Sequence, residues 1–390
     1  MTERPLKVLF VSHAFPRHAG DAAGAFVLAL AHAVAERGVA VEVLAPSAPG
    51  LAAEELVEGV RVHRYRYAPA TWETLAYAGT MAEQVRDSWR GKLALLLMLR
   101  AGRRAVKRLV RDFAPDVIHC HWWFPSGLMV GGGSLPLLVT MHGSDVRLAR
   151  GPLARWLFAR VSARAASMLA VSSWLARRAT EALGGRTVGT APMPAATHLF
   201  TPSSAGAARF GDRMLFVGRL NAQKGMRDLL QALAQSRRPW SVDVVGDGPD
   251  RADLAQLAAT LGVEARVRWH RHLAQPALAA FYRAASAVVI PSTDEGLGLV
   301  GVEASLCETP VVGYASGGLT DVVRDGHTGW LVPVGDVAAL SHALDGVVER
   351  PERARAAGQA ARQFALDRFS PEAVGARYRA LYDAVLEPSR

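Results

Sequence analysis

Cysteine is rare in this sequence. The chain of 390 residues contains two cysteines, Cys120 and Cys307, which lie far apart. Two separated cysteines provide neither a disulfide framework nor a zinc site built from cysteine ligands. The sequence therefore indicates a protein of a reducing compartment, and we expect a cytoplasmic location.

Long apolar segments are missing as well. The apolar run at residues 7–12 has the length of a strand and lacks the small-residue cleavage site of a signal peptide. The longest run elsewhere, residues 93–99, is far shorter than the roughly 18 residues that a membrane-spanning helix requires. We expect neither an export signal nor a membrane span.

Three common motifs of phosphate chemistry are also missing, either from the whole chain or from the place where they would bind a dinucleotide. No G-x-G-x-x-G follows the first predicted strand of either half, which argues against a dinucleotide-binding dehydrogenase. No G-x-x-x-x-G-K-[ST] loop occurs, and no Asp-x-Asp pair is available to clamp a metal ion against a diphosphate. We therefore expect neither a metal ion nor a cofactor, and an enzyme acting on phosphates would depend on its own cations.

What the sequence does contain is an alternation of strand-like apolar runs with helical patterns, which is typical of parallel sheets. A stretch with three prolines, residues 191–204, interrupts this alternation. We predict an α/β fold with two doubly wound Rossmann-like domains facing a central cleft, at residues 1–195 and 205–370, and a C-terminal helix at 371–390 that returns to the first domain. The predicted strands are residues 7–12, 39–45, 117–121, 137–140, 168–171, 214–218, 242–246, 267–269, 287–290, 310–313 and 330–332.

Two glutamates and two glycines follow the strand predicted at 287–290. Gly296 and Gly298 permit a tight turn, and the helix that begins after them suits an anion such as diphosphate. Glu295 and Glu303 can hold sugar or ribose hydroxyls by charge-assisted hydrogen bonds. Taken alone, two glutamates at this spacing are common and one is often an exposed helix residue.

Two cations follow the first strand predicted in the same half. Arg219 and Lys224 stand directly after residues 214–218. Because open α/β sheets bind ligands outside the carboxyl ends of their strands, these cations can face a diphosphate held by the later helix. The alternative is that both are surface cations of a loop.

A series of motifs in a distinctive order extends over residues 214–336. It reads G-R-L-x-x-x-K-G, V-x-G-x-G-P, P-S-x-x-E-G-x-G-L-x-x-x-E, T-P-V-V, G-G and D-G-x-T-G-x-L-V-P. In the first half, residues 115–121 and 140–145 and the two glycines Gly20 and Gly24 match more loosely. This order strongly resembles glycosyltransferase family 4, which implies a retaining enzyme of the GT-B architecture. The resemblance implies that the domain at 1–195 binds the acceptor and that the domain at 205–370 binds the nucleotide sugar.

The resemblance implies a role for individual residues. Arg219 and Lys224 would bind the diphosphate of the donor, and Glu295 would bind the transferred sugar. His142 would face that sugar from the other domain, whereas His119 and His121 either join it or only shape the cleft. The residues expected to bind substrate are Gly20, Gly24, Asp145, Gly218, Gly296, Leu297, Gly298, Leu299, Val300, Glu303 and His272, with Glu303 on the ribose hydroxyls.

The expected reaction is the transfer of a hexose from a nucleotide-diphosphate sugar to an acceptor hydroxyl, with retention and without a metal ion. The acceptor is expected to be a lipid-linked glycan or a precursor of a cell-surface polysaccharide. The resemblance implies that the leaving phosphate accepts the proton, so no general base is expected. Two alternatives stay open: a nucleotide-sugar epimerase or phosphorylase of the same fold, and a basic membrane-binding adaptor without catalysis.

Positive charge is concentrated in the first half, where residues 1–200 hold 24 Lys and Arg against 14 Asp and Glu, while residues 201–390 hold 21 of each. Some of these cations recur at spacings of three and four, which predicts one basic helix face. They are Arg100, Arg103, Arg104, Lys107, Arg108 and Arg111. Such a helix either lies on an anionic membrane surface, which implies a peripheral enzyme on the inner face of the membrane, or packs on the sheet as an ordinary helix. No nucleic-acid motif is present, so we expect no nucleic-acid partner.

Overall fold

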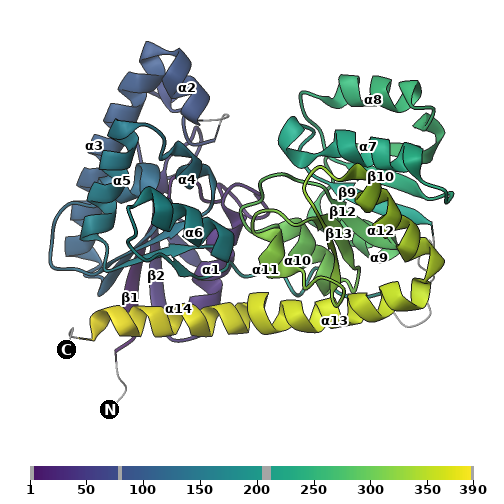
Figure 1. Cartoon of the computed structure of the whole chain (residues 1–390). Coiled ribbons are helices and arrows are strands. Elements are labelled where there is room, and N and C mark those ends of the chain that lie inside the picture. The colour runs from purple at the N-terminus through teal and green to yellow at the C-terminus, as the bar shows by residue number, and fades with distance from the viewer. Residues whose placement is uncertain (1–3, 78–80, 204–211, 388–390) are drawn as a thin grey trace. The chain divides into compact units, whose positions relative to one another are not determined.

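The computed structural model describes residues 4–77, 81–203 and 212–387. The chain divides into two compact units, whose elements are labelled in Figure 1. Unit 1 comprises Met1–Pro194 and Pro371–Arg390, and unit 2 comprises Ala195–Ser370. The change of unit falls in the proline-containing stretch at 191–204, and residues 204–211, where the second domain is predicted to begin, lie outside the described residues.

Unit 1 is built on an eight-stranded sheet with the order β3-β4-β2-β1-β5-β6-β7-β8. All neighbouring strands run parallel except β3 and β4, which form an antiparallel pair at the edge. Without β3 this is a Rossmann-type order, and the direction of strand succession reverses between β1 and β5. The strands are β1 (Leu6–Val11), β2 (Val39–Pro46), β3 (Glu54–Val57), β4 (Val60–Tyr65), β5 (Val117–His121), β6 (Leu137–Met141), β7 (Ser167–Ala170) and β8 (Gly189–Thr190).

Helices connect most of the parallel strands of unit 1. The C-terminal helix α14 packs against the first helix, α1. A Cβ atom on Gly375 would lie 2.2 Å from the carbonyl oxygen of Ala33, so only glycine permits this approach. The helices are α1 (Ala25–Ala35), α2 (Met81–Asp87), α3 (Trp89–Asp112), α4 (Ser144–Leu148), α5 (Pro152–Arg164), α6 (Ser173–Ala182) and α14 (Pro371–Leu386), with short turns η1 (Ala70–Trp72) and η2 (Trp123–Gly127).

Helix α3 carries the predicted basic face. Met98, Val106 and Leu109 are buried on one side of the helix, and the six predicted cations between positions 100 and 111 are all exposed. The basic face is therefore confirmed, and the buried side packs as in an ordinary domain helix. Toward its amino end, however, the same helix exposes 64% of Trp89 and 59% of Leu96.

Unit 2 is built on a six-stranded sheet with the order β11-β10-β9-β12-β13-β14, in which all neighbours run parallel. This is the Rossmann order, and it reverses between β9 and β12. The strands are β9 (Arg213–Val217), β10 (Ser241–Val245), β11 (Val267–His270), β12 (Ala287–Ile290), β13 (Val311–Tyr314) and β14 (Gly329–Val332). The helices are α7 (Met226–Gln235), α8 (Arg251–Thr260), α9 (Gln275–Ala284), α10 (Leu299–Leu306), α11 (Leu319–Val322), α12 (Val337–Glu349) and α13 (Pro351–Phe369), with short turns η3 (Ala222–Lys224) and η4 (Glu264–Arg266).

The apolar runs of unit 2 build its core. Phe216 and Val244 project from neighbouring strands into one cluster, where Leu229 and Leu233 of α7 meet them. Strands that are buried on both faces are expected to be nearly continuous apolar runs. Such runs stand out from the helical segments between them, so the strands of unit 2 could be predicted from the sequence.

The prediction of two Rossmann-like parallel sheets is confirmed. Each predicted strand matches an observed strand whose ends differ by at most one residue. The prediction missed β3, β4 and β8. Strand β4 contains Arg61, His63 and Arg64, and these polar residues hide its apolar alternation; β8 is too short to leave a pattern.

Candidate functional site

The strand reversal of unit 2 brings two loops together, one after β9 and one after β12. The backbone N–H of Thr293 donates to the carbonyl oxygen of Gln223 (3.0 Å), and the Gln223 side chain donates to the carbonyl oxygen of Asp294. Ligands of open α/β sheets bind at the carboxyl ends of the strands at such a reversal. The two charged motifs of the sequence therefore meet where this fold binds ligands.

A salt bridge joins these loops. Lys224 Nζ lies 2.5 Å from Glu295 Oε1, and the two side chains are 24% and 12% exposed. Lys224 is placed by the turn η3, where the Asn221 side-chain oxygen accepts a hydrogen bond from the Lys224 backbone N–H (3.3 Å). The pair sets one cation and one carboxylate side by side at the reversal.

Glycines allow the backbones around this pair to pack closely. A Cβ atom on Gly225 would lie 1.9 Å from the carbonyl oxygen of Pro291, and one on Gly317 would lie 2.3 Å from that of Glu295. The N–H of Gly318 donates to this Glu295 oxygen (2.8 Å). The G-G motif thus supports the Glu295 loop from the side of β13.

Helix α10 begins directly after the Glu295 loop. Gly298 precedes it with φ 83°, a left-handed conformation that glycine adopts without strain. The first backbone N–H groups of a helix have no acceptor within the helix, so this end, which includes Leu299 and Val300, favours an anion. Of the predicted turn residues, Leu297 is buried and Gly296 is half-buried.

Glu303 lies within α10 and accepts a hydrogen bond from the Tyr282 hydroxyl of α9 (2.7 Å). Burial raises the pKa of Glu303 to about 7, and the hydrogen bond from Tyr282 acts in the opposite direction. Tyr282 itself is fully buried, and its carbonyl oxygen accepts a hydrogen bond from the Thr309 hydroxyl (2.6 Å). Glu303 is therefore held in one position while its charge responds to pH near neutrality.

The other predicted residues of unit 2 also follow strands of this sheet. Gly218 comes directly after β9, and its N–H donates to the carbonyl oxygen of Val245 (3.0 Å). Arg219 is exposed, and no ion-pair partner for it occurs within the residues that the structure describes. His272 is exposed after β11, two strands away from β9 in the sheet.

Unit 1 gathers aromatic and imidazole rings near its own reversal. The ring of Trp122, which follows β5, lies 4.3 Å from that of His13, which comes after β1. The same ring lies 4.5 Å from His142, which follows β6, and Phe26 of α1 lies 4.9 Å from His142. Trp122 has φ 67°, an uncommon conformation for a bulky residue that is found most often at functional sites.

These histidines are neutral near physiological pH. Burial lowers the pKa of His13 to about 4 and lowers the pKa values of His121 and His142 well below the usual range. His121 Nδ1 lies 3.2 Å from His142 Nε2, so one of these nitrogens donates to the other. Nε2 of His121 and Nδ1 of His13 are buried without a hydrogen-bond partner in the described part of the chain, and ligand hydroxyls would satisfy such atoms.

Asp145 holds the His142 loop in place. One of its carboxylate oxygens accepts the backbone N–H groups of His142 and Gly143 (both 3.1 Å), and the other accepts that of Trp123 (3.1 Å). Burial raises the pKa of Asp145 to about 6, and these backbone hydrogen bonds act in the opposite direction. The residue predicted to bind substrate thus bonds the protein's own backbone and ties the ends of β5 and β6 together.

His119 connects the sheet to the C-terminal helix. Its ring nitrogens lie 2.8 Å from the Tyr382 hydroxyl and 2.8 Å from the Thr140 hydroxyl. Burial lowers the pKa of His119 to about 3. The Tyr378 hydroxyl of α14 lies 3.4 Å from the same Thr140 oxygen. These contacts fasten α14 to the centre of the unit 1 sheet.

The first glycine-rich loop leads from β1 to α1. Gly24 has φ 72°, and a Cβ atom there would lie 2.3 Å from the carbonyl oxygen of Ala14. Gly20 has φ 76° with no atom within 4 Å of a Cβ position, and its N–H donates to Glu58 (3.3 Å). Packing and backbone conformation both require glycine at position 24, whereas backbone conformation alone requires it at position 20.

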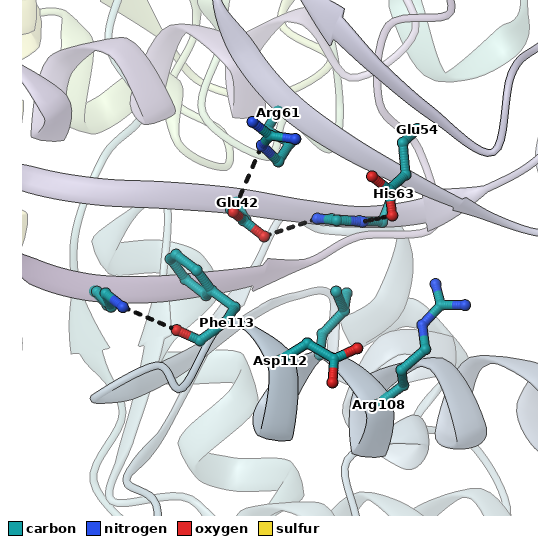
Figure 2. A pocket seen from close by; sticks show the side chains of 9 residues that line it. Glu42, Glu54, Arg61, His63, Arg108, Asp112 and Phe113 are labelled. Carbon is teal, nitrogen blue, oxygen red and sulfur yellow. Dashed lines mark hydrogen bonds and ion pairs between the residues drawn. The ribbon is translucent and has the colours of Figure 1, made fainter.

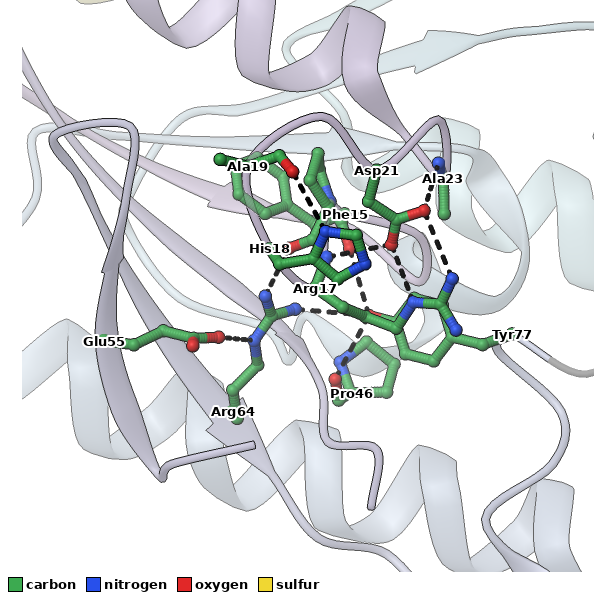
Figure 3. A network of polar contacts seen from close by, with 11 residues as sticks. Phe15, Arg17, His18, Ala19, Asp21, Ala23, Pro46, Glu55, Arg64 and Tyr77 are labelled. Carbon is green, nitrogen blue, oxygen red and sulfur yellow. Dashed lines mark hydrogen bonds and ion pairs between the residues drawn. The ribbon is translucent and has the colours of Figure 1, made fainter. Parts of the chain in front are cut away.

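A polar network fixes this loop (Figure 3). Arg17 donates to Asp21 (2.6 Å), and this bond holds the pKa of Asp21 well below its usual range. The fully buried Arg64 side chain donates to Glu55 (2.7 Å), to the Tyr77 hydroxyl (3.2 Å) and to the carbonyl oxygen before Arg17. The loop is therefore held from both sides by arginines.

The sequence analysis missed several residues around the two reversals. His13 and Trp122 both come directly after the strands that flank the reversal of unit 1, so their position was a usable signal. Phe26 begins a helix and resembles any apolar helix residue. Nothing in the sequence pairs Tyr282 with Glu303.

The composition of the described residues bears on metal ions and on membranes. These residues contain no cluster of three or more His, Cys, Asp and Glu side chains that could hold a metal ion. No helix within the same ranges combines the length and the apolar character needed to cross a bilayer.

Both halves of the chain are similar to known proteins. Residues 211–364 match the family model described as glycosyl transferases group 1, and residues 21–196 match that of the glycosyl transferase 4-like domain. The D-inositol 3-phosphate glycosyltransferase of Kribbella flavida is 33% identical over 88% of this chain and 86% of that protein. Among solved structures, the sucrose-phosphate synthase of Thermosynechococcus elongatus matches with a TM-score of 0.79 and 23% identity over 98% of this chain and 100% of that one. Anabaena HepE in complex with UDP and glucose matches with a TM-score of 0.69 and 17% identity over 97% and 100% of the two chains. The chain belongs to glycosyltransferase family 4 and is a glycosyltransferase with the GT-B fold.

Proposed function

We propose that unit 2 binds a nucleotide-diphosphate sugar and that the protein transfers this sugar to an acceptor hydroxyl with retention. The pair of Lys224 and Glu295 carries the proposal, because it sets a cation for phosphate beside a carboxylate for sugar hydroxyls. The complex of Anabaena HepE with UDP and glucose supports a donor of this class.

The charged groups of unit 2 divide the donor among them. Arg219, Lys224 and the first turn of α10 stabilise the negative charge that grows on the leaving diphosphate. Glu295 accepts hydrogen bonds from hydroxyls of the transferred sugar, and Glu303 accepts those of the ribose. Two fixed cations and a helix end replace the metal ion that other transferases use, so we propose a metal-independent reaction.

We propose that retention arises by same-face attack, in which the acceptor approaches the face that the diphosphate leaves and no covalent sugar–enzyme intermediate forms. The bond between the anomeric carbon and the phosphate oxygen breaks, and the acceptor oxygen forms the new bond to that carbon. The proton of the acceptor hydroxyl passes to the leaving phosphate, whose charge the cations stabilise. No side chain has to act as a general base.

Unit 1 supplies the neutral part of the machinery. His142 hydrogen-bonds the transferred sugar, and the rings of Phe26 and Trp122 beside it offer apolar faces to sugar carbons. A neutral imidazole can donate through one nitrogen and accept through the other. The low pKa of His142, which burial causes, keeps it in this form.

A screen for donors tests the proposal directly. A nucleotide sugar present at 100 times its dissociation constant stabilises the folded protein by about 2.7 kcal/mol, which raises the melting temperature. We expect this shift for one class of nucleotide sugar in the wild type and its loss in Lys224→Ala. Equal shifts in both proteins would contradict the assignment of the site. Release of nucleoside diphosphate without a new glycoside would favour the epimerase or phosphorylase instead.

We further propose that the enzyme works on the cytoplasmic face of the membrane with a lipid-linked acceptor. The observation that favours this is α3, whose exposed Trp89, Leu93 and Leu96 precede the exposed cations of the same helix. An apolar patch beside basic residues suits a membrane with anionic lipids, where each cation contributes about 1 kcal/mol.

Sedimentation with vesicles tests the membrane proposal. The wild type should bind phosphatidylglycerol vesicles and not phosphatidylcholine vesicles, and the variant Arg103→Glu, Arg104→Glu, Lys107→Glu should lose this binding. Replacement of Trp89 and Leu96 by serine separates apolar insertion from charge attraction. Negligible binding of every protein to both vesicles would indicate a soluble acceptor.

A further inference from the structure

A second concentration of positive charge lies in unit 1, away from α3. A cavity of about 310 Å³ is bordered by α4, by the segment that joins α4 to α5, and by α6. Arg147, Arg150, Arg155 and Arg178 line it, and Glu181 is the single acidic residue among its lining residues. We call this cavity the arginine pocket.

The fold aims these arginines at one space. Arg147 belongs to α4, Arg150 to the connection, Arg155 to α5 and Arg178 to α6, so four separate segments contribute one cation each. The Arg178 guanidinium lies 5.1 Å from the centre of the Trp174 ring, which also lines the pocket. Stacking on an aromatic face fixes the plane of a guanidinium and leaves its N–H edge available for an anion.

Three of the four arginines of the pocket have no acidic partner among the described residues. Within the described residues, Arg150, Arg155 and Arg178 make no ion pair with a carboxylate, and neither does Glu181 with any cation. Like charges gathered around one cavity repel each other, and a bound anion would relieve that repulsion.

Another cavity of unit 1 shows what a neutralised one looks like (Figure 2). It has a volume of about 290 Å³ and lies beside the amino end of β1 and the carboxyl end of α3. There His63 lies 2.7 Å from Glu42 and 3.2 Å from Glu54, and Arg61 lies 3.7 Å from Glu42. In that cavity Glu42 pairs with both His63 and Arg61, whereas Arg150, Arg155 and Arg178 of the arginine pocket make no ion pair within the described residues.

The arginine pocket lies next to the loop of unit 1 that carries His142. Gly143, which directly follows His142, is part of its lining. The Asp145 carboxylate that fixes the backbone of His142 also fixes that of Gly143. An anion in the pocket would therefore lie next to the loop whose histidine is proposed to face the transferred sugar.

We propose that the arginine pocket binds a phosphate group of the acceptor. This inference rests on the proposed function: if unit 2 binds the donor, unit 1 is left to bind the acceptor. Guanidinium groups match phosphate with paired, planar hydrogen bonds, so four of them suit a phosphate better than a neutral glycan. The phosphate belongs either to a small phosphorylated acceptor or to the headgroup of a lipid.

Binding of glycerol phosphate, followed by phosphorus NMR, tests the pocket on the full chain. The double variant Arg155→Ala, Arg178→Ala should bind this probe at least about tenfold more weakly than the wild type, since it lacks two of the charged groups that would hydrogen-bond the phosphate. Arg178→Lys keeps the charge without the planar guanidinium and should fall between them. Arg160→Ala, Arg177→Ala removes the same charge from exposed positions of the same two helices, α5 and α6, outside the pocket lining, and should leave binding within twofold.

Each outcome decides the proposal. Equal weakening in the pocket double variant and in Arg160→Ala, Arg177→Ala would reveal general charge attraction and overturn the proposal, as would the absence of binding to the wild type. Thermal shift with the nucleotide sugar, which reports on unit 2, checks that the variants are folded. If the nucleotide sugar does not raise the melting temperature of the wild type, the proposed function is refuted. If it does, but the wild type does not bind glycerol phosphate, only the proposal for the arginine pocket is refuted.

Vesicles distinguish the two sources of the phosphate. If the pocket takes a lipid headgroup, phosphatidylglycerol vesicles should displace glycerol phosphate from the wild type, and the pocket double variant should transfer sugar poorly to a lipid-linked acceptor. If it takes a soluble acceptor, the vesicles should leave glycerol phosphate bound.

Discussion

The two strand reversals of this protein occupy equivalent positions in two similar sheets and carry opposite kinds of side chain. In unit 2 the reversal is charged, with Lys224 and Glu295 in a salt bridge. In unit 1 it holds neutral rings, with Trp122 between His13 and His142. Burial keeps the pKa values of these histidines low, so the rings stay uncharged.

Under the proposed function, this difference lets one fold support two kinds of binding. The Rossmann order determines where a ligand lies, and the residues after the strands determine what it is. A diphosphate that gains charge during the reaction needs fixed cations, whereas sugar hydroxyls need neutral hydrogen-bond partners. Removing a charge from unit 2 should therefore cost more activity than removing a ring from unit 1.

The largest effect is expected at Lys224. Replacement by alanine should lower kcat/KM by about 10² to 10³, the usual consequence of losing one preorganised charged donor. The matched control is Arg227→Ala, which removes an exposed cation from α7 three positions later. Circular dichroism of both variants should match the wild type. If Lys224→Ala were as active as the control, Lys224 would not stabilise the leaving diphosphate, and the proposed role of charge in unit 2 would be wrong.

A pH profile tests the charge of Glu303. If the ionised carboxylate binds ribose, kcat/KM should rise with pH through about 7, the pKa to which burial raises this group. Tyr282→Phe removes a hydrogen bond that lowers this pKa, so the rise should move to higher pH. The variant should be impaired at neutral pH and close to wild type in alkaline solution. If Tyr282→Phe has the same pH profile as the wild type, the group that titrates in the profile is not Glu303.

Much of unit 2 could be predicted from the sequence because its function depends on local motifs. The glycines at 225 and 317 stand where any side chain would collide with a neighbouring carbonyl oxygen. Close packing therefore requires glycine at these two positions of the motifs. The strands are buried apolar runs whose ends are clear. The cations follow a strand directly, and the fold brings the later glutamates to them.

What could not be predicted depends on contacts between distant residues. Asp145 bonds the backbone of Trp123 across two loops, and nothing near it in the sequence indicates this. His119 meets Tyr382 over 263 positions. The strand β4 was missed because its polar side chains find partners only after β2 and β3 have folded beside it.

A smaller loss is expected when a neutral ring is removed. His142→Ala should lower kcat/KM by roughly tenfold, because a neutral hydrogen bond contributes about 0.5 to 1.5 kcal/mol. His142→Asn, which keeps a donor and an acceptor without charge, should recover part of the loss. The measurement is kcat/KM for the donor at saturating acceptor. A loss as large as that of Lys224→Ala would show that unit 1 stabilises charge as well, and the contrast between the units would fail.

The smallest effect is expected from a chelator. Arg219, Lys224 and the amino end of α10 provide fixed positive charge at the reversal of unit 2, and these groups are part of the folded chain. Excess chelator should therefore change the rate by less than about twofold, because preorganised donors of the protein carry the electrostatic stabilisation. The informative comparison is Lys224→Ala with and without added Mg²⁺: if a metal could take the place of the ammonium, Mg²⁺ would restore the variant. We expect no such restoration, because no aspartate pair stands at the reversal to orient the ion. Complete loss of wild-type activity in chelator, reversed only by a divalent ion, would mean that the cations of unit 2 are insufficient by themselves and would overturn the electrostatic account of that unit.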